Sequence, residues 1–227
     1  TGTVGAGGRV IAWADQRAMV LGQFDVTPGI DSGAGGFVEV SSGDILTFNG
    51  EVKAGMDNRT GTLLLDPKDI NVTTSPGNCA NGNNCLALNR MDFNSKWENS
   101  VTITPDTITA ALDAGTDVTL QAGRDITITN DIEVDNTGGD GGDLEMQAGR
   151  RITIQAAITT DNGALTLKAN DCTGGGSRCT NNRGNGAGYI LMDSGGSINT
   201  GTGDFTATLG TQSTSGDITL KLSLIHI

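Results

Sequence analysis

The sequence is poor in the residue types on which many enzymes and nucleic-acid-binding proteins depend. Only 4% of its 227 residues are aromatic, and its single histidine is His226, almost at the end of the chain. Without an internal histidine, the usual Ser-His, Cys-His and histidine-rich zinc sites cannot be built. The 14 Lys and Arg are outnumbered by 26 Asp and Glu and form no cluster, which argues against a nucleic-acid-binding surface.

Long apolar segments are also missing. No apolar run approaches the roughly 20 residues that a membrane-spanning helix requires, so we expect no membrane span. No signal peptide opens the chain, and Thr1 begins in the middle of a pattern. We therefore expect the chain to be an internal piece of a longer protein.

The residues that are abundant do not by themselves decide between an ordered and a disordered chain. The sequence has 35 Gly, 30 Thr and 21 Asp but only 5 Glu, and its net charge is −12. Leu, Ile, Val and Phe make up 50 of 227 residues, or 22%, which is barely above the ~20% below which acidic chains tend to be disordered. The pattern of these residues along the chain must decide.

The chain contains an internal repeat. Asp117–Ile128 reads DVTLQAGRDITI and Asp143–Ile154 reads DLEMQAGRRITI, so 8 of 12 positions are identical at an offset of 26 residues. A fainter copy, FVEVSSGDILTFNGEV, covers Phe37–Val52 at an offset of 80 and aligns Val38 with Val118 and Phe48 with Ile128. Internal repeats of this length are typical of proteins built from stacked structural units.

Each repeat alternates apolar and polar residues over four to six positions and stops at Gly, Asn or Asp. Such alternation predicts half-buried strands, because successive side chains point to opposite faces. One unit is too small to bury its own apolar side, but stacked units can. With no helical spacers between the strands, the pattern predicts an all-β parallel β-helix over residues 1–222, with Val118 and Leu120 stacked against Leu144 and Met146.

Three segments depart from this rhythm. TPDTITAALDAG at 104–115 predicts a short helix over 105–114, with Ile108, Ala111 and Leu112 on one face. We interpret residues 75–100 and 171–188 as non-repetitive inserts. The last residues, 223–227, follow GDITLKL without a turn and are expected to be a non-native tail.

The four cysteines lie in pairs in Gly- and Asn-rich loops: Cys79 with Cys85, and Cys172 with Cys179. Four cysteines allow three connectivities, of which pairing within each loop is the simplest. Zinc is the alternative, but neither spacing is CxxC and no histidine is near. We expect two local disulfides, and therefore a secreted or cell-surface protein.

Three blocks of sequence resemble large bacterial exoproteins of the filamentous-haemagglutinin family (adhesins and haemolysins). They are GGFVEVSSGDILTFNGEV, GTLLLDPKDINVTT and ITPDTITAALDAGTDVTLQAGRDITIT, and the second, from Gly61, is the most diagnostic. The resemblance covers residues 1–160 well and the remainder loosely. It implies a right-handed parallel β-helix, two-partner secretion through a dedicated outer-membrane pore, and a role in adhesion, haemolysis or toxin display. The chain has no Asn-Pro, so the family's secretion domain is expected to precede it or to overlap only its beginning.

Two acidic clusters are candidate sites. Asp135, Asp140 and Asp143, in DNTGGDGGD, offer oxygen ligands for calcium, although a Gly/Asp turn explains the same residues and is the favoured interpretation. Asp66 and Asp69, in LDPKD, have the residue type of a glycosidase pair, but Lys68 is the only nearby cation, and we favour a turn.

Three arginines and two sequons complete the candidates. If Arg124 and Arg150 stack on consecutive units, they form a basic ladder with Arg151 beside them, and a solvated edge with salt bridges to Asp125 and other acids is favoured over an anion site. Asn58 and Asn71 head N-x-T sequons, which are weak indications of glycosylation in a chain rich in Asn and Thr.

These observations lead to one expected function and two alternatives. We expect a non-catalytic, cofactor-free shaft segment of a secreted surface adhesin, a virulence-type exoprotein whose partners are the outer-membrane pore and a host cell surface or glycans. The alternatives are a polysaccharide-acting β-helix enzyme and the shaft of a contact-dependent toxin. The Cys-bearing inserts are the expected display surfaces, because binding residues concentrate on loops.

Overall fold

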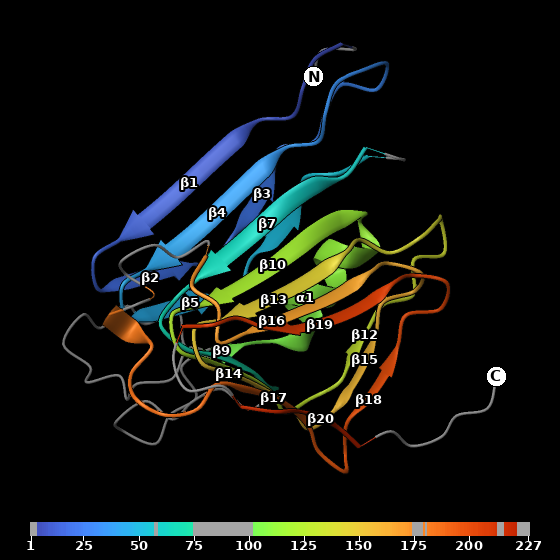
Figure 1. Cartoon of the computed structure of the whole chain (residues 1–227). Coiled ribbons are helices and arrows are strands. Elements are labelled where there is room, and N and C mark those ends of the chain that lie inside the picture. The colour runs from blue at the N-terminus through green and yellow to red at the C-terminus, as the bar shows by residue number, and fades with distance from the viewer. Residues whose placement is uncertain are drawn as a thin grey trace.

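The computed structural model describes residues 4–56, 59–74, 102–173, 179, 181–212 and 216–221 (Figure 1). The expected Cys79–Cys85 disulfide, the 75–100 insert, the Asn58 sequon and the 223–227 tail lie outside these residues.

Fifteen of the 20 described strands belong to one of two large parallel sheets. The seven-stranded sheet has the order β1 (Arg9–Ala14), β4 (Phe37–Ser42), β7 (Gly61–Asp66), β10 (Thr116–Ala122), β13 (Leu144–Ala148), β16 (Leu165–Ala169) and β19 (Phe205–Leu209). The eight-stranded sheet has the order β2 (Arg17–Val20), β5 (Ile45–Phe48), β9 (Thr102–Ile103), β8 (Ile70–Val72), β11 (Asp125–Ile128), β14 (Arg151–Ile154), β17 (Tyr189–Met192) and β20 (Ile218–Leu220). Apart from β8 and β9, which are consecutive strands of the same sheet, the chain visits the two large sheets in alternation as it advances (Figure 1).

Shorter strands form a third side. They pair as β3 (Gln23–Asp25) with β6 (Glu51–Lys53), and as β12 (Ile132–Glu133), β15 (Ala157–Thr159) and β18 (Ser197–Asn199). All pairings between named strands are parallel. The all-β, parallel character predicted from the alternation is thus confirmed.

The interior is built from rows of apolar side chains that run across the strands. Val118 pairs with Leu144 and Leu120 with Met146, and all four side chains are at most 1% exposed. Ile126 and Ile128 pair in the same way with Ile152 and Ile154. Because side chains alternate between the two faces of a strand, the intervening residues point outward, and most of them are Thr, Gln or charged. The stacking predicted from the 26-residue repeat is confirmed.

The fainter repeat also keeps its predicted register. Val38 pairs with Leu63, which pairs with Val118, so the three lie in one row. In the other large sheet, Phe48 reaches Ile128 through Ile103 and Val72. The offset of 80 therefore corresponds to one intervening strand in the first sheet and two in the second.

The eight-stranded sheet has one strand more than the seven-stranded sheet, because β9 lies between β5 and β8. The helix fills the matching space on the third side. The helix α1 (Pro105–Asp113) contacts β6, β10 and β12, and so fills the third side where the two short sheets are interrupted. A helix is about 10–12 Å wide with its side chains, against about 4.8 Å between paired strands. The helix therefore occupies the height of roughly two strands in the stack, whereas a single strand at the same position would occupy only one.

The helix prediction is confirmed in place and in orientation. Its C-terminal residue is Asp113, one residue earlier than expected, and Gly115 follows with φ 66°. The predicted apolar face of Ile108, Ala111 and Leu112 is buried. Thr104 occupies the N-cap position, but its hydroxyl contacts that of Thr107 at 2.9 Å instead of a backbone amide. None of the described helices is long and apolar enough to cross a membrane.

Candidate functional site at the corner of the sheets

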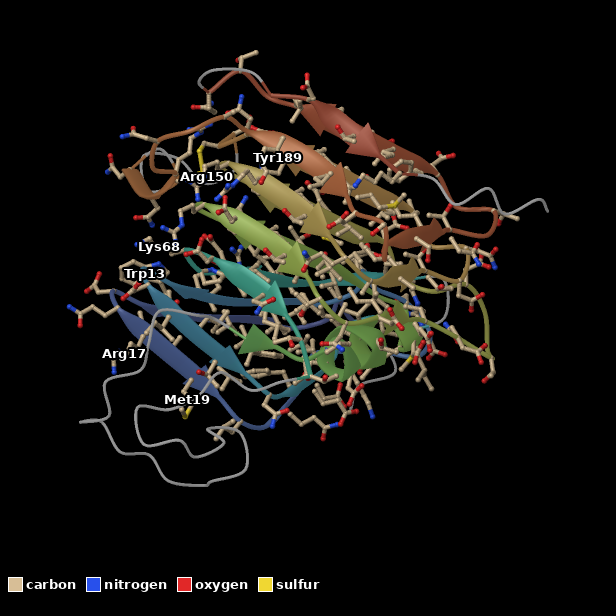
Figure 2. All side chains as sticks on the ribbon, turned by 90° about the horizontal axis from the view of Figure 1, so that it is seen from below. Trp13, Arg17, Met19, Lys68, Arg150 and Tyr189 are labelled. Atoms are coloured by element: carbon tan, nitrogen blue, oxygen red, sulfur yellow. A yellow bond between two sulfur atoms is a disulfide. The ribbon has the colours of Figure 1, made fainter. Side chains whose placement is uncertain are left out.

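Charged side chains gather where each strand of the seven-stranded sheet turns into the eight-stranded sheet. We call this edge the corner; it comprises residues 15–16, 43–44, 67–69, 123–124, 149–150, 170–173 and 181–188 together with the first residue of each following strand. Figure 2 shows Lys68, Arg150 and Tyr189 along it, with Trp13 and Arg17 at its N-terminal end. These turns are short except for the one between β16 and β17, which carries the 171–188 insert.

The predicted arginines form a ladder with aspartates of the preceding strand. Arg124 grips Asp69 with two hydrogen bonds, from Nε at 2.7 Å and from Nη2 at 2.5 Å. One strand further on, Asp125 accepts bonds from Arg150 Nε at 2.9 Å and from Arg151 Nη2 at 2.8 Å. The salt-bridged edge expected from the repeat is present, because strand register places each arginine beside the aspartate of the coil before.

Electrostatics favour the charged form of Asp125. Burial alone would raise the pKa of its carboxyl, but hydrogen bonds from Arg150 and Arg151 outweigh that effect and hold the pKa below its usual value. The same contact raises the pKa of Arg151, whose guanidinium also lies 5.4 Å from the centre of the Tyr189 ring. The contact between Asp125 and Arg151 therefore favours the charged form of both side chains.

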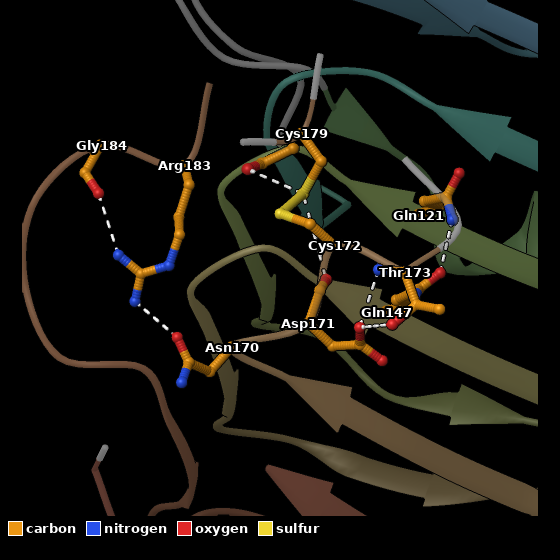
Figure 3. Close-up of a disulfide and its surroundings, with 10 residues drawn as sticks. Gln121, Gln147, Asn170, Asp171, Cys172, Thr173, Cys179, Arg183 and Gly184 are labelled. Atoms are coloured by element: carbon orange, nitrogen blue, oxygen red, sulfur yellow. Dashed lines mark hydrogen bonds between the residues drawn. A yellow bond between two sulfur atoms is a disulfide. The ribbon is translucent and has the colours of Figure 1, made fainter. Parts of the chain in front are cut away.

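The Cys172–Cys179 disulfide, shown in Figure 3, lies at the corner, with Cys179 Sγ 3.7 Å from the carbonyl oxygen of Gly123. The expected pairing is confirmed, with the two Cα atoms 5.4 Å apart. Both cysteines are only 5% exposed, so the disulfide itself is buried, whereas neighbouring described residues of the insert are exposed. Among the residues of the insert that the structure describes, Thr173, residue 181 and residues 184–187 are exposed.

Two repeat glycines explain why the insert can pack so closely. A Cβ at Gly149 would lie 2.7 Å from Cys179 Sγ and 2.3 Å from the carbonyl oxygen of Gly123. A Cβ at Gly123 would lie 2.9 Å from the Cβ of Asn182. The glycines of the two QAGR repeats thus form a bare backbone platform on which the insert rests. The sequence does carry a signal for this platform, since the glycine is identical in both repeats. A glycine at the end of a strand is already explained by a turn, so the repeat alone did not indicate a packing role.

Arg183 is a buried residue of the insert that hydrogen-bonds to other parts of the same loop. The sequence did not indicate this role. Arg183 is 5% exposed, and its guanidinium donates to Asn170 Oδ1 at 2.6 Å and to the carbonyl oxygens of Gly184 and Gly186 at 3.0 Å (Figure 3). Its Nε has no partner in the described part of the chain. Burial, followed by the nearby positive charge of Arg150, lowers the pKa of Arg183. A lone arginine in a Gly- and Asn-rich loop gave no sequence signal for such a role.

A polar ladder runs beside the disulfide on the outer face of the seven-stranded sheet. Gln121 Nε2 donates to Gln147 Oε1, and Asp171 accepts a hydrogen bond from the backbone N–H of Thr173 at 2.8 Å (Figure 3). Burial would raise the pKa of Asp171, but hydrogen bonds from Thr173 and Gln147 outweigh it and lower the pKa. The insert is therefore joined to the sheet by polar contacts as well as by packing.

A shallow depression opens between this ladder and the insert. Its lining comprises Ser42, Asp66, Pro67, Gln121, Gly123, Cys179 and Asn182. Its empty volume of about 250 Å³ includes open solvent, so the depression is far smaller than the ~300–1,000 Å³ cavities that enclose a whole small molecule. Ser42 is 1% exposed, and its Oγ has no hydrogen-bond partner among the described residues.

The two members of the suspected glycosidase pair have different surroundings. Asp69 is held by Arg124 and also accepts a hydrogen bond from the backbone N–H of Asp125 at 3.2 Å. Asp66 lines the depression at the end of β7. The geometry gives Asp69 a structural role, and the pair is not arranged around a shared cleft.

The suspected calcium residues are not gathered together. In the residues that the structure describes, no three His, Cys, Asp or Glu side chains are grouped so that they could hold a metal ion. Asp143 instead accepts a hydrogen bond from the backbone N–H of Ala164 at 2.8 Å, and Asp140 Oδ1 accepts one from Asn162 at 3.1 Å.

Aspartates bridge neighbouring coils in the same way elsewhere. Asp117 accepts from the N–H of Asp143 at 3.0 Å, and Asp131 from the N–H of Ala157 at 2.7 Å. The short side chain of Asp at the start of a strand can accept a hydrogen bond from the backbone N–H of the neighbouring coil. This geometry is a physical reason for the excess of Asp over Glu in the sequence. Asn71, the second sequon, lies within β8 with its Oδ1 buried and without a partner among the described residues.

Comparison with known proteins adds no relative. No protein-family model matches the chain, and no curated protein is detected as similar to it. The functional argument therefore depends on the geometry described above.

Proposed function

We propose that the chain is a segment of right-handed parallel β-helix that serves as the shaft of a secreted bacterial surface adhesin, of the filamentous-haemagglutinin type that its sequence resembles. The observation that carries this proposal is the unbroken parallel stack with continuous apolar rows, such as the row that joins Val38, Leu63 and Val118. Such rows make a rigid object whose length is set by the number of coils. Right-handedness follows the strong preference of parallel crossover connections.

Several features support a structural and adhesive role over a catalytic one. The charged groups of the corner are paired with one another, as Asp125 is with Arg150 and Arg151. The depression beside them is too small to enclose a substrate. The Cys172–Cys179 disulfide favours an oxidising setting, which agrees with secretion and surface display.

The shape is tested in solution. Seven strands with about 4.8 Å between neighbours give a stack about 29 Å high. Small-angle X-ray scattering of a tandem dimer of the chain should show an increase in maximum dimension by about the height of one stack. A compact dimer of unchanged thickness would contradict the shaft.

Adhesion is tested with beads. Beads coated with the chain should attach to cultured epithelial cells, whereas beads coated with the heat-denatured chain should not. Equal attachment of the two would show that the folded surface has no adhesive role. Secretion is tested separately, by fusing a two-partner secretion domain to the chain and measuring export with and without its pore partner.

A further inference from the structure

Exposed apolar side chains mark the two ends of the stack. Of the large apolar side chains exposed in the described residues, six lie within residues 4–30, in the first coil, and two, Phe205 and Ile218, lie in the last two strands. None lies between residues 31 and 204 in the part of the chain that the structure describes. Phe205 and Ile218 pair with the buried Leu165 and Ile190, so they belong to the interior rows, yet they are 39% and 40% exposed. The interior is therefore incompletely covered at the ends.

These ends are the edges of the two large sheets. β1 and β2 are the first strands of the sheets, and β19 and β20 are the last (Figure 1). The outer edge of each carries backbone N–H and C=O groups that pair with no other described strand, and such an edge is a template for a strand of another chain. Because all pairings between named strands are parallel, the β19 edge of one copy offers the β1 edge of another the same parallel pairing that β16 offers β19.

The interior rows keep their register across such a contact. The row that ends in Phe205 begins with Val10, and the row that ends in Leu220 begins with Val20. None of these four residues is fully buried. Continuing both rows brings Phe205 of one copy onto Val10 of the next, and Leu220 onto Val20. Removing these apolar side chains from water favours the contact.

The two ends carry opposite charges in matching columns. Arg9 and Asp204 each lie one residue before the first and last member of the Val10 row, so stacking brings Asp204 of one copy against Arg9 of the next. Both side chains are exposed. Arg17 and Asp217 stand in the same relation to each other in the eight-stranded sheet. Contact between two like ends would instead bring like charges together, so the charges favour a head-to-tail arrangement.

The chain already contains the arrangement that this contact would complete. At the corner, Arg151 binds Asp125 of the preceding strand at 2.8 Å and lies 5.4 Å from the centre of the Tyr189 ring of the following strand. Arg9 lies 5.0 Å from the centre of the Phe37 ring of the following strand. Arg9 thus has the aromatic half of the arrangement, and the aspartate at the other end of a second copy supplies the acidic half.

We propose that a second copy of this chain stacks on the first head to tail, with the β19 and β20 edges of one copy paired with the β1 and β2 edges of the next. A contact between two unlike surfaces does not close on itself, so the copies form filaments. The proposal goes beyond the shaft function, which requires only the stack within one chain.

The test is the mass of the purified full chain in solution, measured by sedimentation velocity over a wide range of concentration. An open series of species that lengthens with concentration is expected. A single chain at every concentration would overturn the proposal, and so would a dimer that grows no further, because a closed dimer joins two like ends.

Two variants and their mixture test the charged contact. Arg9→Asp and Asp204→Arg each place like charges at the contact, and each alone should weaken association at least about tenfold. An equimolar mixture of the two should associate again, because the altered end of one variant then meets the altered end of the other. Glu133→Arg, which makes the same change of charge as Asp204→Arg at an exposed position of β12 in the middle of the stack, should leave association unchanged. A mixture that associates no better than its components, or an equal loss in Glu133→Arg, would refute the contact.

A third pair of variants tests the interior row. Phe205→Lys places a charge on the end of the row and should abolish association, whereas Thr206→Lys, its outward neighbour on β19, should not. Melting curves establish that both variants are folded. Equal association of the two would show that the row does not take part in the contact.

Failure of this proposal is distinguishable from failure of the shaft. If the chain stays single but its tandem dimer lengthens by one stack, the shaft stands and the contact between copies is wrong. If copies associate as expected but the tandem dimer does not lengthen, the contact stands and the shaft is wrong.

Discussion

The apolar rows and the corner are stabilised in opposite ways. Within a row, each coil repeats nearly the same contact, so Leu120 packs on Leu65 and Met146 as Ile126 packs on Ile70 and Ile152. At the corner each contact is individual: Arg124 with Asp69, Arg183 with Asn170, and a disulfide on two glycines. Repetition gives the rows a stability that spreads along the stack, whereas a corner contact stabilises only its own turn. Each region should therefore respond differently to single substitutions.

The largest effect is expected in a row. Leu120→Ala removes a side chain with 0% exposure from between two others, and it should lower the free energy of unfolding by about 2–5 kcal/mol. Thr119→Ala, its outward neighbour, should change it by less than about 0.5 kcal/mol. Urea denaturation followed by circular dichroism checks both. Similar losses for the two variants would show that Leu120 is not in a closely packed interior.

The rows were predictable from the sequence because their signal is periodic. Alternation fixed which face of each strand is buried, and the 26-residue repeat fixed the pairing of Val118 with Leu144. The insertion of β9 between β5 and β8 could not be predicted, because two residues carry no period. The packing of the insert on the corner could not be predicted either. It depends on the absence of side chains at Gly123 and Gly149, and on Arg183, whose partners are mostly backbone carbonyls.

The next effect tests whether the glycine platform is needed. Gly149→Ala places a Cβ 2.3 Å from a backbone oxygen, which must move, and should destabilise the chain by about 1–3 kcal/mol. Gly139→Ala is the matched control, because no atom lies within 4 Å of its added Cβ. Thermal melting of both variants checks the difference. Equal melting temperatures would show that the corner backbone yields easily and that the insert is not seated on it.

A smaller effect is expected from the ionic ladder. Asp125→Asn removes the charge that Arg150 and Arg151 share and should cost about 1–2 kcal/mol at neutral pH. Because the folded state lowers the pKa of Asp125, its contribution is complete above the ordinary carboxyl pKa of about 3.9 and is lost as pH falls through the folded value. The difference between the chain and the variant should therefore shrink below about pH 4. Denaturation curves across the acid range provide the measurement.

Asp117 is a control for Asp125, because its pKa is shifted in the opposite direction. Burial, helped by the charge of Asp143, raises its pKa despite the hydrogen bonds that it accepts. A raised folded pKa makes the charged form less favourable in the folded state, so its contribution to stability improves as pH falls through that value. Asp117→Asn should be neutral or stabilising at pH 7, since an amide oxygen can still accept the N–H of Asp143. A loss as large as that of Asp125→Asn would contradict this assignment.

The smallest effect on the whole molecule is expected from the disulfide. Replacing Cys172 and Cys179 together by Ser opens a short loop, at a local cost of about 2 kcal/mol, but it leaves the apolar rows intact. The melting temperature of the stack should hardly change, whereas hydrogen exchange at residues 170–173 and 181–188 should accelerate, since these residues lose the covalent tie that holds them on Gly149. The Gly149→Ala variant should show the same local acceleration with the disulfide still closed, because it lifts the same surface from below. If the double Ser variant instead lowers the melting temperature as much as Leu120→Ala, the corner is part of the cooperative core, and the separation of repetitive rows from individual corner contacts is wrong.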